Sequence, residues 1–235
     1  MQPAKPVVLD GESLSLRELH EIGFENRGVV LSEEAWERVR RGRAVIRRLL
    51  DAGETVYGIN TGFGMFSNVR IEPTQLKKLQ VNLIRSHASG TGENIDWRLA
   101  RMLFALRINV LAKGHSGVRE ETLRRAVSAL NAGCIPAVPE QGTVGASGDL
   151  APLAHLALGL MGEGDMWHPQ LERFSSAAQV LQEYSLPPVQ LHSKEGLALI
   201  NGTQFISAIG AEACMRAGRC VKAAILAGAL TLEVL

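Results

Sequence analysis

The segment 203–235 constrains the fold more than any other part of the chain. It is rich in Ala, Gly, Ile and Leu and carries few charges. A helix that is apolar on nearly all sides is buried, either in a bundle or at a subunit interface. The pattern continues through residues 231–235 with no capping signal. We therefore expect a long helix that opens a central helical bundle.

The rest of the chain also follows a mainly helical pattern. Leu76, Leu83 and His87, for example, fall on one face of a helix. Ser32 is suited to cap a helix at its N-terminus, and Gly53 is suited to end the same helix. The expected helices span residues 13–22, 32–52, 73–87, 97–112, 120–132, 152–161 and 194–202.

The lead-in to these helices has a different character. Residues 4–30 mix short apolar runs with glycines, which indicates one or two short strands beside the first helix. A polar patch that contains Pro169 and Pro187 separates the helix at 152–161 from the one at 194–202. We expect one mainly α domain over residues 1–235. It has a small α/β part at about 1–30, a helical part that carries the site at 31–202, and the start of the bundle at 203–235.

Composition limits the classes of partner. The chain has 235 residues, 46% of them hydrophobic, and a net charge of +1, which gives no support for binding nucleic acid or an anionic membrane. It shows neither a signal peptide nor an apolar run that would span a membrane. Its three cysteines lack metal-ligand or paired spacing, so we expect reduced thiols in a cytoplasmic protein and no metal site.

The chemistry centres on three small residues, Ala146, Ser147 and Gly148. The Gly148 nitrogen can attack the Ala146 carbonyl, because glycine has no Cβ to block the approach. Loss of water from the ring closure and of the Ser147 hydroxyl leaves a methylidene-imidazolone, which is an electrophile. The backbone has to be held compressed for this reaction. The alternative is a plain small-residue turn before a helix; a serine-hydrolase elbow or a phosphate loop does not fit the spacing.

Three further segments carry candidate groups. Tyr57 stands in a glycine loop, residues 57–64, where it can swing over a pocket; a tyrosine, with an ordinary pKa of about 10, is a poor base unless positive charge lies nearby. His87 lies at the end of an apolar helix face and is either a ligand contact or a buried, satisfied histidine. Asn201 and Gln204 flank a glycine between two helices, where amides bind carbonyls or carboxylates, or simply cap a helix.

Together these segments resemble the aromatic amino acid ammonia-lyases, the family of histidine, phenylalanine and tyrosine ammonia-lyases and the related aminomutases. The resemblance runs from about residue 54 to residue 235, and its most specific parts are 57–64, 86–90, 142–155 and 194–204. The pair Ser86-His87 is similar to the histidine-specific branch, whereas tyrosine lyases tend to have His-Leu there and phenylalanine lyases an apolar pair.

The resemblance implies a role for each candidate residue. Ala146, Ser147 and Gly148 would form the methylidene-imidazolone autocatalytically, with no external cofactor. Tyr57 would take the β-proton of the substrate, His87 would contact its imidazole, and Asn201 would hold the prosthetic ring and the amino group. Gly64 would line the pocket through its backbone, and Gln204 would lie behind these groups. The implied reaction converts L-histidine to trans-urocanate and ammonia, the first step of histidine degradation.

The resemblance also implies a longer and assembled protein with the mainly helical ammonia-lyase and fumarase–aspartase type of fold. Family members are roughly twice as long, and each site of their homotetramer draws on three subunits. We therefore expect this chain to be truncated and inactive alone. Three alternatives remain: a tyrosine or phenylalanine ammonia-lyase, a catalytically silent chain that co-assembles with full-length subunits, and a serine hydrolase that uses Ser147 and His155.

Overall fold

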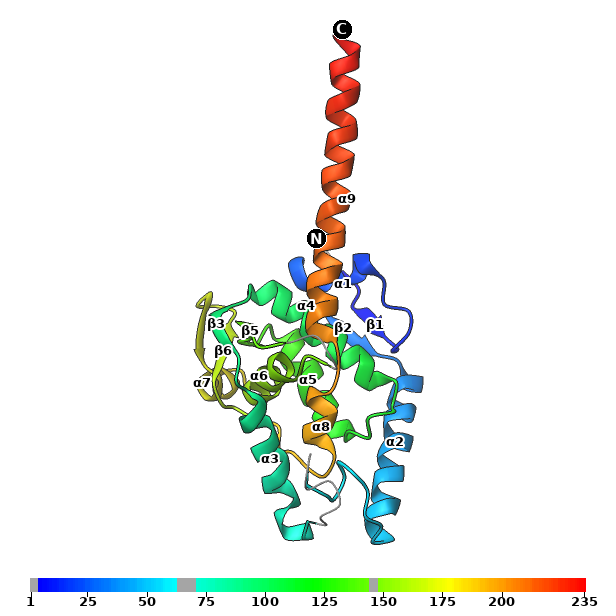
Figure 1. Cartoon of the computed structure of the whole chain (residues 1–235), viewed down its shortest axis with the longest axis vertical. Helices are drawn as coiled ribbons and strands as arrows, with labels where there is room; N and C mark the ends of the chain where they lie inside the picture. The colour runs from blue at the N-terminus through cyan, green and yellow to red at the C-terminus, as the bar shows by residue number, and fades with distance from the viewer. Residues whose placement is uncertain (1–3, 63–70, 144–147) are drawn as a thin grey trace.

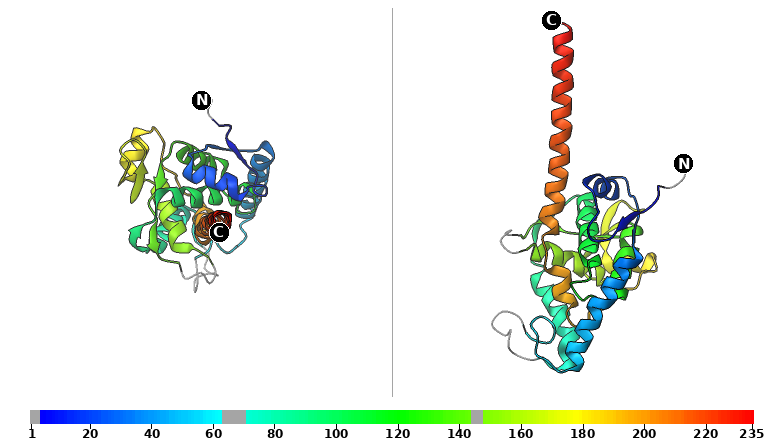
Figure 2. Two further views of the ribbon diagram at one scale, coloured as in Figure 1. Left: turned by 90° about the horizontal axis from the view of Figure 1, so that it is seen from above. Right: turned by 90° about the vertical axis from the view of Figure 1, so that its right-hand side faces the viewer.

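The molecule consists of a helical body and one long helix that projects from it. The computed structural model describes residues 4–62, 71–143 and 148–235. The projecting helix is α9 (Gln204–Glu233), and its far end lies well away from the body (Figure 1). Viewed from above, α9 is seen end-on against the body (Figure 2). The expected mainly α fold is confirmed.

Each expected helix is present in the body. The helices there are α1 (Leu16–Phe24), α2 (Glu33–Asp51), α3 (Leu76–His87), α4 (Trp97–Ala112), α5 (Glu120–Asn131), α6 (Leu150–Leu160), α7 (Ala177–Glu183) and α8 (Glu195–Ile200). A short 3-10 turn, Pro73–Gln75, precedes α3. The bounds of α4 agree with the sequence pattern, and α2 is capped by Ser32 as expected. Helix α7 was not expected.

The first helix begins later than the sequence pattern predicts because two serines compete for its cap. The hydroxyl of Ser13 donates to the carboxylate of Asp10 at 2.7 Å, which keeps Ser13 outside the helix. Ser15 instead accepts from the Glu18 amide, and the Glu18 carboxylate accepts from the Ser15 amide. This reciprocal capping box starts α1 at Leu16.

The strands are short and form three small sheets. The first sheet pairs β1 (Val7–Leu9) with β2 (Val29–Leu31) in parallel, as the lead-in suggested, and the second pairs β3 (Thr91–Asn94) with β5 (Pro139–Gln141). The third joins β4 (Ile135–Pro136), β6 (Asp165–His168) and β7 (Arg173–Ser176). The β6–β7 pair occupies part of the predicted polar patch. Trp167 stacks on Trp97 at 5.1 Å and meets Phe174 edge-on, which ties this pair of strands to the start of α4.

Helix α4 is the centre of the core. It packs against α1, α5 and α9, and most of its side chains are buried. The apolar ones include Met102, Leu103, Phe104 and Ile108. Two arginines of the same helix, Arg101 and Arg107, are also buried, each with 2% of its surface exposed.

The environment of α9 changes along its length. Its first turns are buried against the body, with Phe205 and Ala208 nearly inaccessible. Farther out its large apolar side chains are exposed, among them Val221, Ile225 and Leu226. The burial predicted for residues 203–235 is therefore observed only for the turns of α9 next to the body. The far turns of α9 are not covered by any other described part of the chain. Within residues 4–62, 71–143 and 148–235, no helix has the length and hydropathy needed to cross a membrane.

All three cysteines are free thiols in different surroundings. Cys134 is buried in the body, and burial raises its pKa to about 12. Cys214 and Cys220 are exposed on α9. Across the described residues, no group of three or more His, Cys, Asp or Glu side chains is placed to hold a metal ion.

Candidate functional site

The candidate site is built around the short connection between α8 and α9. Gly202 of this connection accepts a hydrogen bond from the Asp149 amide at 2.7 Å. Gly148 has φ +150°, and a Cβ atom placed on it would lie 3.1 Å from the Gly202 carbonyl oxygen and 3.6 Å from Oδ1 of Asn201. A side chain at Gly148 would be strained and crowded. The fold thus places two of the predicted site residues, Gly148 and Asn201, side by side.

The segment that would cyclise is tied together at its two ends. Ala146 and Ser147, like Gly64, lie outside the described residues. On either side of them, Thr143 donates through its hydroxyl to Oδ1 of Asp149 at 2.8 Å. This hydrogen bond joins Thr143 to Asp149, so the residues on the two sides of the segment are held close to each other.

Asp149 links that loop to α9. Its carboxylate is fully buried, and its second oxygen accepts from the Ile206 amide at 3.0 Å. Ile206 lies in the first turn of α9, where unpaired amides and the helix dipole favour a negative charge. One side chain therefore joins the loop before α6, the start of α6 and the start of α9.

The end of α3 lies against the same loop. A Cβ atom on Gly142 would lie 3.1 Å from Cα of Gly90, so the two backbones approach closely. The Gly90 amide donates to Nε2 of His155 at 3.0 Å. Burial lowers the pKa of His155, which favours the neutral ring that this hydrogen bond requires. These contacts place His87, three residues before Gly90, near the loop that carries the tripeptide.

His87 is partly satisfied by its own helix. Its Nδ1 lies 2.9 Å from the Leu83 carbonyl oxygen and 3.0 Å from Oγ of Ser86. The carbonyl can only accept, so Nδ1 carries the proton and Nε2 is the acceptor of a neutral ring. Nε2 makes no hydrogen bond within the described part of the chain. His87 is half-buried, with one ring nitrogen satisfied by its own helix; its contact with a ligand stays a prediction.

Tyr57 lies on a turn that contacts the start of α8. Its side chain is 52% exposed. The next residue, Gly58, has φ +73°, and a Cβ atom there would lie 2.6 Å from Cδ2 of Leu197 and 3.4 Å from Nζ of Lys194. Burial lowers the pKa of the Lys194 ammonium. A cationic group thus lies beside the tyrosine turn, and Asn201 follows at the other end of α8.

Sequence reasoning missed one residue that contacts the candidate site, Arg107 of α4. Its guanidinium donates to the Asn201 carbonyl at 3.1 Å, to Oε1 of Gln204 at 2.8 Å, and to the Ala198 carbonyl. Burial lowers its pKa to about 10, so it remains charged at neutral pH. The available signal was an arginine between two apolar residues, Leu106 and Ile108, in a helix whose other side chains are mostly apolar.

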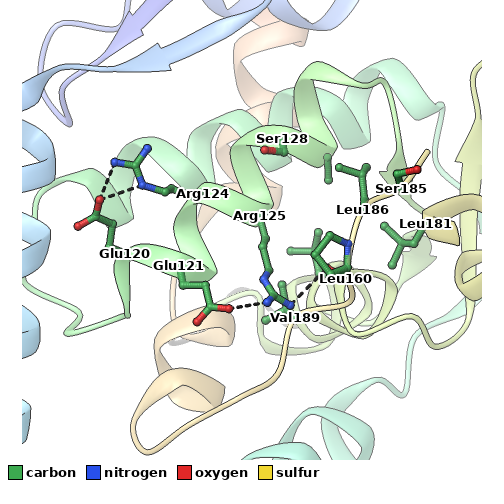
Figure 3. A pocket seen from close by; sticks show the side chains of 12 residues that line it. Glu120, Glu121, Arg124, Arg125, Ser128, Leu160, Leu181, Ser185, Leu186 and Val189 are labelled. Atoms are coloured by element: carbon green, nitrogen blue, oxygen red, sulfur yellow. Dashed lines mark hydrogen bonds and ion pairs between the residues drawn. The ribbon is translucent and has the colours of Figure 1, made fainter.

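A cavity of about 580 Å³ lies elsewhere, between α5 and the segment 181–189 (Figure 3). Leu160, Leu181 and Leu186 form part of its apolar wall. Ion pairs from Arg124 to Glu120 and from Arg125 to Glu121 lie along its rim. None of the described candidate site residues lines it, so it is separate from the site built around Gly148 and Asn201.

Comparison with known sequences gives a match over nearly the whole chain. The family model described as "Aromatic amino acid lyase" matches residues 14–235. Histidine ammonia-lyase of Bos taurus is 50% identical over 234 residues, which is 100% of this chain and 36% of the relative. The chain thus spans about a third of the length of the curated relatives it matches.

Solved structures give the same picture of the fold. Histidine ammonia-lyase from Trypanosoma cruzi superposes with a TM-score of 0.85 at 51% identity, over 90% of this chain and 41% of that protein. Tyrosine aminomutase from Streptomyces globisporus superposes with a TM-score of 0.82 at 38% identity, over 88% of this chain and 38% of that protein. About nine-tenths of the chain therefore has the fold of these enzymes.

Proposed function

The chain belongs to the aromatic amino acid lyase family, and from this premise we propose that it forms the N-terminal part of a histidine ammonia-lyase. The proposed reaction is the non-oxidative elimination of ammonia from L-histidine to give trans-urocanate. The observation that carries the proposal is the 50% identity to histidine ammonia-lyases along the whole chain. The close approach of Gly148 to Asn201 in the structure also supports this proposal.

The prosthetic group of the proposal is a methylidene-imidazolone made from Ala146, Ser147 and Gly148. The residues present fit it: Gly148 has no Cβ in a place where one would crowd Gly202, and Thr143 and Asp149 hold the ends of the segment close. When formed, this group supplies an electrophile that makes the amino group of the substrate a better leaving group. Helix α6 follows the segment directly, and the positive end of its dipole favours negative charge there.

The chain's own side chains supply binding and proton transfer. Tyr57 removes the β-proton of the substrate, from a turn that lies beside Lys194 and the start of α8. Asn201 orients the substrate amino group through its amide. Gln204, with its oxygen held by Arg107, supports Asn201 from behind.

Specificity for histidine is assigned to His87. Because Leu83 holds Nδ1 in its protonated form, Nε2 is available to accept a hydrogen bond from an imidazole N–H of the substrate. A phenylalanine side chain has no donor to offer at this point, whereas the phenol O–H of tyrosine can donate to the same nitrogen. The acceptor therefore supports histidine over phenylalanine, and the preference over tyrosine rests on the identity to histidine ammonia-lyases.

The proposed protein works as a homotetramer in the cytoplasm. The exposed apolar side chains of outer α9 support burial in a helical bundle between copies, and the free thiols support a reducing compartment. Since the chain spans about a third of the relatives it matches, its activity is proposed for the assembled enzyme. A silent chain that only co-assembles with full-length subunits is the competing outcome.

Two measurements test the proposal. Intact mass spectrometry of the chain, alone and co-expressed with a full-length histidine ammonia-lyase, is expected to give a species two waters lighter than the sequence mass. The purified assembly is expected to release urocanate from L-histidine in preference to the products of L-tyrosine and L-phenylalanine. His87→Leu should shift that preference away from histidine. An unmodified mass in both preparations would refute the prosthetic group, and an unchanged preference in the variant would refute the role of His87.

A further inference from the structure

We infer that Arg107 is a positioning residue of this site: its guanidinium fixes the 198–204 connection so that Asn201 and the Gly202 peptide lie against Gly148. This inference rests on the proposed function for its effect on catalysis. Its geometric part stands on the contacts of the chain alone.

The guanidinium spans both ends of the connection. One nitrogen donates to the carbonyl of Ala198 in the last turn of α8, and the other donates to Asn201 O and to Oε1 of Gln204, where α9 begins. A planar fork with donors on two nitrogens can hold acceptors that lie on separate segments. The C-terminus of α8 also has the partial negative charge that a cation stabilises. One side chain of α4 thus sets the angle at which the chain leaves α8 and enters α9.

Gly202 transmits this constraint to the tripeptide. A Cβ atom on Gly202 would collide with the Arg107 guanidinium and with Oε1 of Gln204, so the arginine packs directly on the backbone of this residue. The carbonyl of Gly202 accepts from the Asp149 amide and lies against Gly148. Arg107, Gly202 and Gly148 are therefore consecutive members of one packed row.

The charge of Arg107 is costly in this place, which argues for a specific use. Among the residues that the structure describes, Arg107 forms no ion pair, and its Nε is buried without a hydrogen-bond partner. A buried cation held only by neutral acceptors is less stable than an apolar side chain of the same volume that packs well. A leucine or methionine, however, would leave the carbonyls of Ala198 and Asn201 without their donor and the connection without its brace.

Arg101 provides a matched control on the same helix. It is equally buried, burial also lowers its pKa to about 10, and its guanidinium also donates to backbone carbonyls. Its acceptors, however, belong to Ile22, Leu130 and Arg27, which are not part of the candidate site. The two arginines therefore share a structural cost and differ in what they hold.

The decisive experiment compares Arg107→Lys with Arg101→Lys by amide hydrogen exchange, measured by mass spectrometry. Both variants keep the positive charge and lose the planar guanidinium with its several donors, so both are expected to lower the midpoint temperature of thermal unfolding. Only Arg107→Lys should lower the amide protection of residues 201–206 and of Asp149, by at least about tenfold. In this variant, local opening of the 198–204 connection no longer has to break the hydrogen bonds of the Arg107 guanidinium. Equal protection of these amides in the two variants, or no change in either, overturns the inference whether or not the chain is active.

A kinetic measurement on the same variants tests this inference separately from the proposed function. In an assembly whose wild type turns over, Arg107→Lys should reduce kcat at least about tenfold with KM changed much less, since a shifted Asn201 affects the reacting geometry. Arg101→Lys should retain kcat within about twofold at a temperature where both variants are folded. If the wild type itself shows neither the mass loss nor turnover, the proposed function fails while the exchange comparison still decides the role of Arg107.

Discussion

The inner and outer parts of α9 have similar apolar sequences but opposite surroundings. Phe205, in the first turn, is 4% exposed and packs in the body, whereas Leu226 is 62% exposed. The inner turns meet α1, α4 and α6; the outer turns extend beyond all three. An apolar sequence thus specifies a helix, and the elements beside it decide whether that helix is buried.

The inner part is also held by polar contacts. Asp149 accepts from the Ile206 amide at its first turn, and Arg107 holds the Gln204 side chain. Farther along the helix, the buried Glu212 forms ion pairs with Arg216 and Arg219, and both arginines are largely exposed. Because the arginine ends of these pairs are solvated, the pairs hold the helix less firmly than fully buried contacts do. The inner turns are fixed by this chain, and the outer turns depend on what covers them.

The largest expected effect comes from Phe205→Ala. Removing this ring leaves a cavity among α4, α6 and α9 and should lower the free energy of unfolding by about 3–5 kcal/mol. The matched control, Leu226→Ala, removes an exposed side chain and should change it by less than about 0.5 kcal/mol. Urea denaturation at low protein concentration, followed by circular dichroism, measures both. Equal losses in the two variants would break the comparison between the parts of α9.

A smaller loss is expected from Asp149→Ala. The change removes the acceptor of the Ile206 amide and opens the link to Thr143, which should cost about 1–3 kcal/mol because a buried donor loses its partner. Asp149→Asn retains an oxygen at this position and should cost less. The same denaturation experiment applies. If the alanine variant were as stable as wild type, the anchor of the inner turns would have to lie elsewhere.

Acid should weaken the body that holds the inner turns. The pKa of His155 is lowered by burial, so the unfolded chain binds the proton at a higher pH than the folded chain does. The stabilisation is therefore complete above the ordinary value of about 6.5 and is lost as the pH falls through the lowered pKa. His155→Gln, which can still accept from the Gly90 amide, should flatten this loss, as measured by unfolding titrations from about pH 7 to pH 5.

The flattening is expected to be partial. The pKa of His192 is also lowered, first by burial and then by Arg119 and Lys77, so it contributes in the same pH range and with the same sign. His192→Gln alone and the double variant separate the two contributions. A wild-type stability that rises on acidification through this range would contradict the assignment of neutral rings to both histidines.

The smallest effect on the single chain is expected from Ile225→Gln on the outer part. At 68% exposure, this side chain should change the free energy of unfolding by less than about 0.5 kcal/mol. Its effect should appear instead in sedimentation velocity as weaker self-association at high protein concentration. Unchanged association together with a large loss of stability would mean that outer α9 is covered within the single chain.

The sequence predicts the helices well where the pattern is local. Helix α4 was predicted with its observed bounds because its signals, an apolar period after an aspartate cap, lie within the segment itself. The β6–β7 strands were missed because their stability comes from Trp97, which is distant in sequence and stacks on Trp167. Strands this short and polar give no periodic signal of their own.

The site shows the same division. The residues Gly148 and Asn201 were singled out by local composition and by resemblance, but no spacing rule places them together; that requires the fold of α6 against α8 and α9. Arg107 could not be assigned at all, because its acceptors lie more than 90 residues away at Ala198, Asn201 and Gln204. A helical pattern identifies a charge on a buried face and says nothing of the groups that satisfy it.

The positions of the three cysteines allow the covering of α9 to be measured by thiol labelling. A thiol reacts with maleimides as the thiolate, so Cys134, buried and with its pKa raised to about 12, should stay unmodified at neutral pH. Cys214 and Cys220 are exposed at two positions along α9. The rate at which each takes up a label therefore reads out how far along α9 any covering extends, without a single engineered residue.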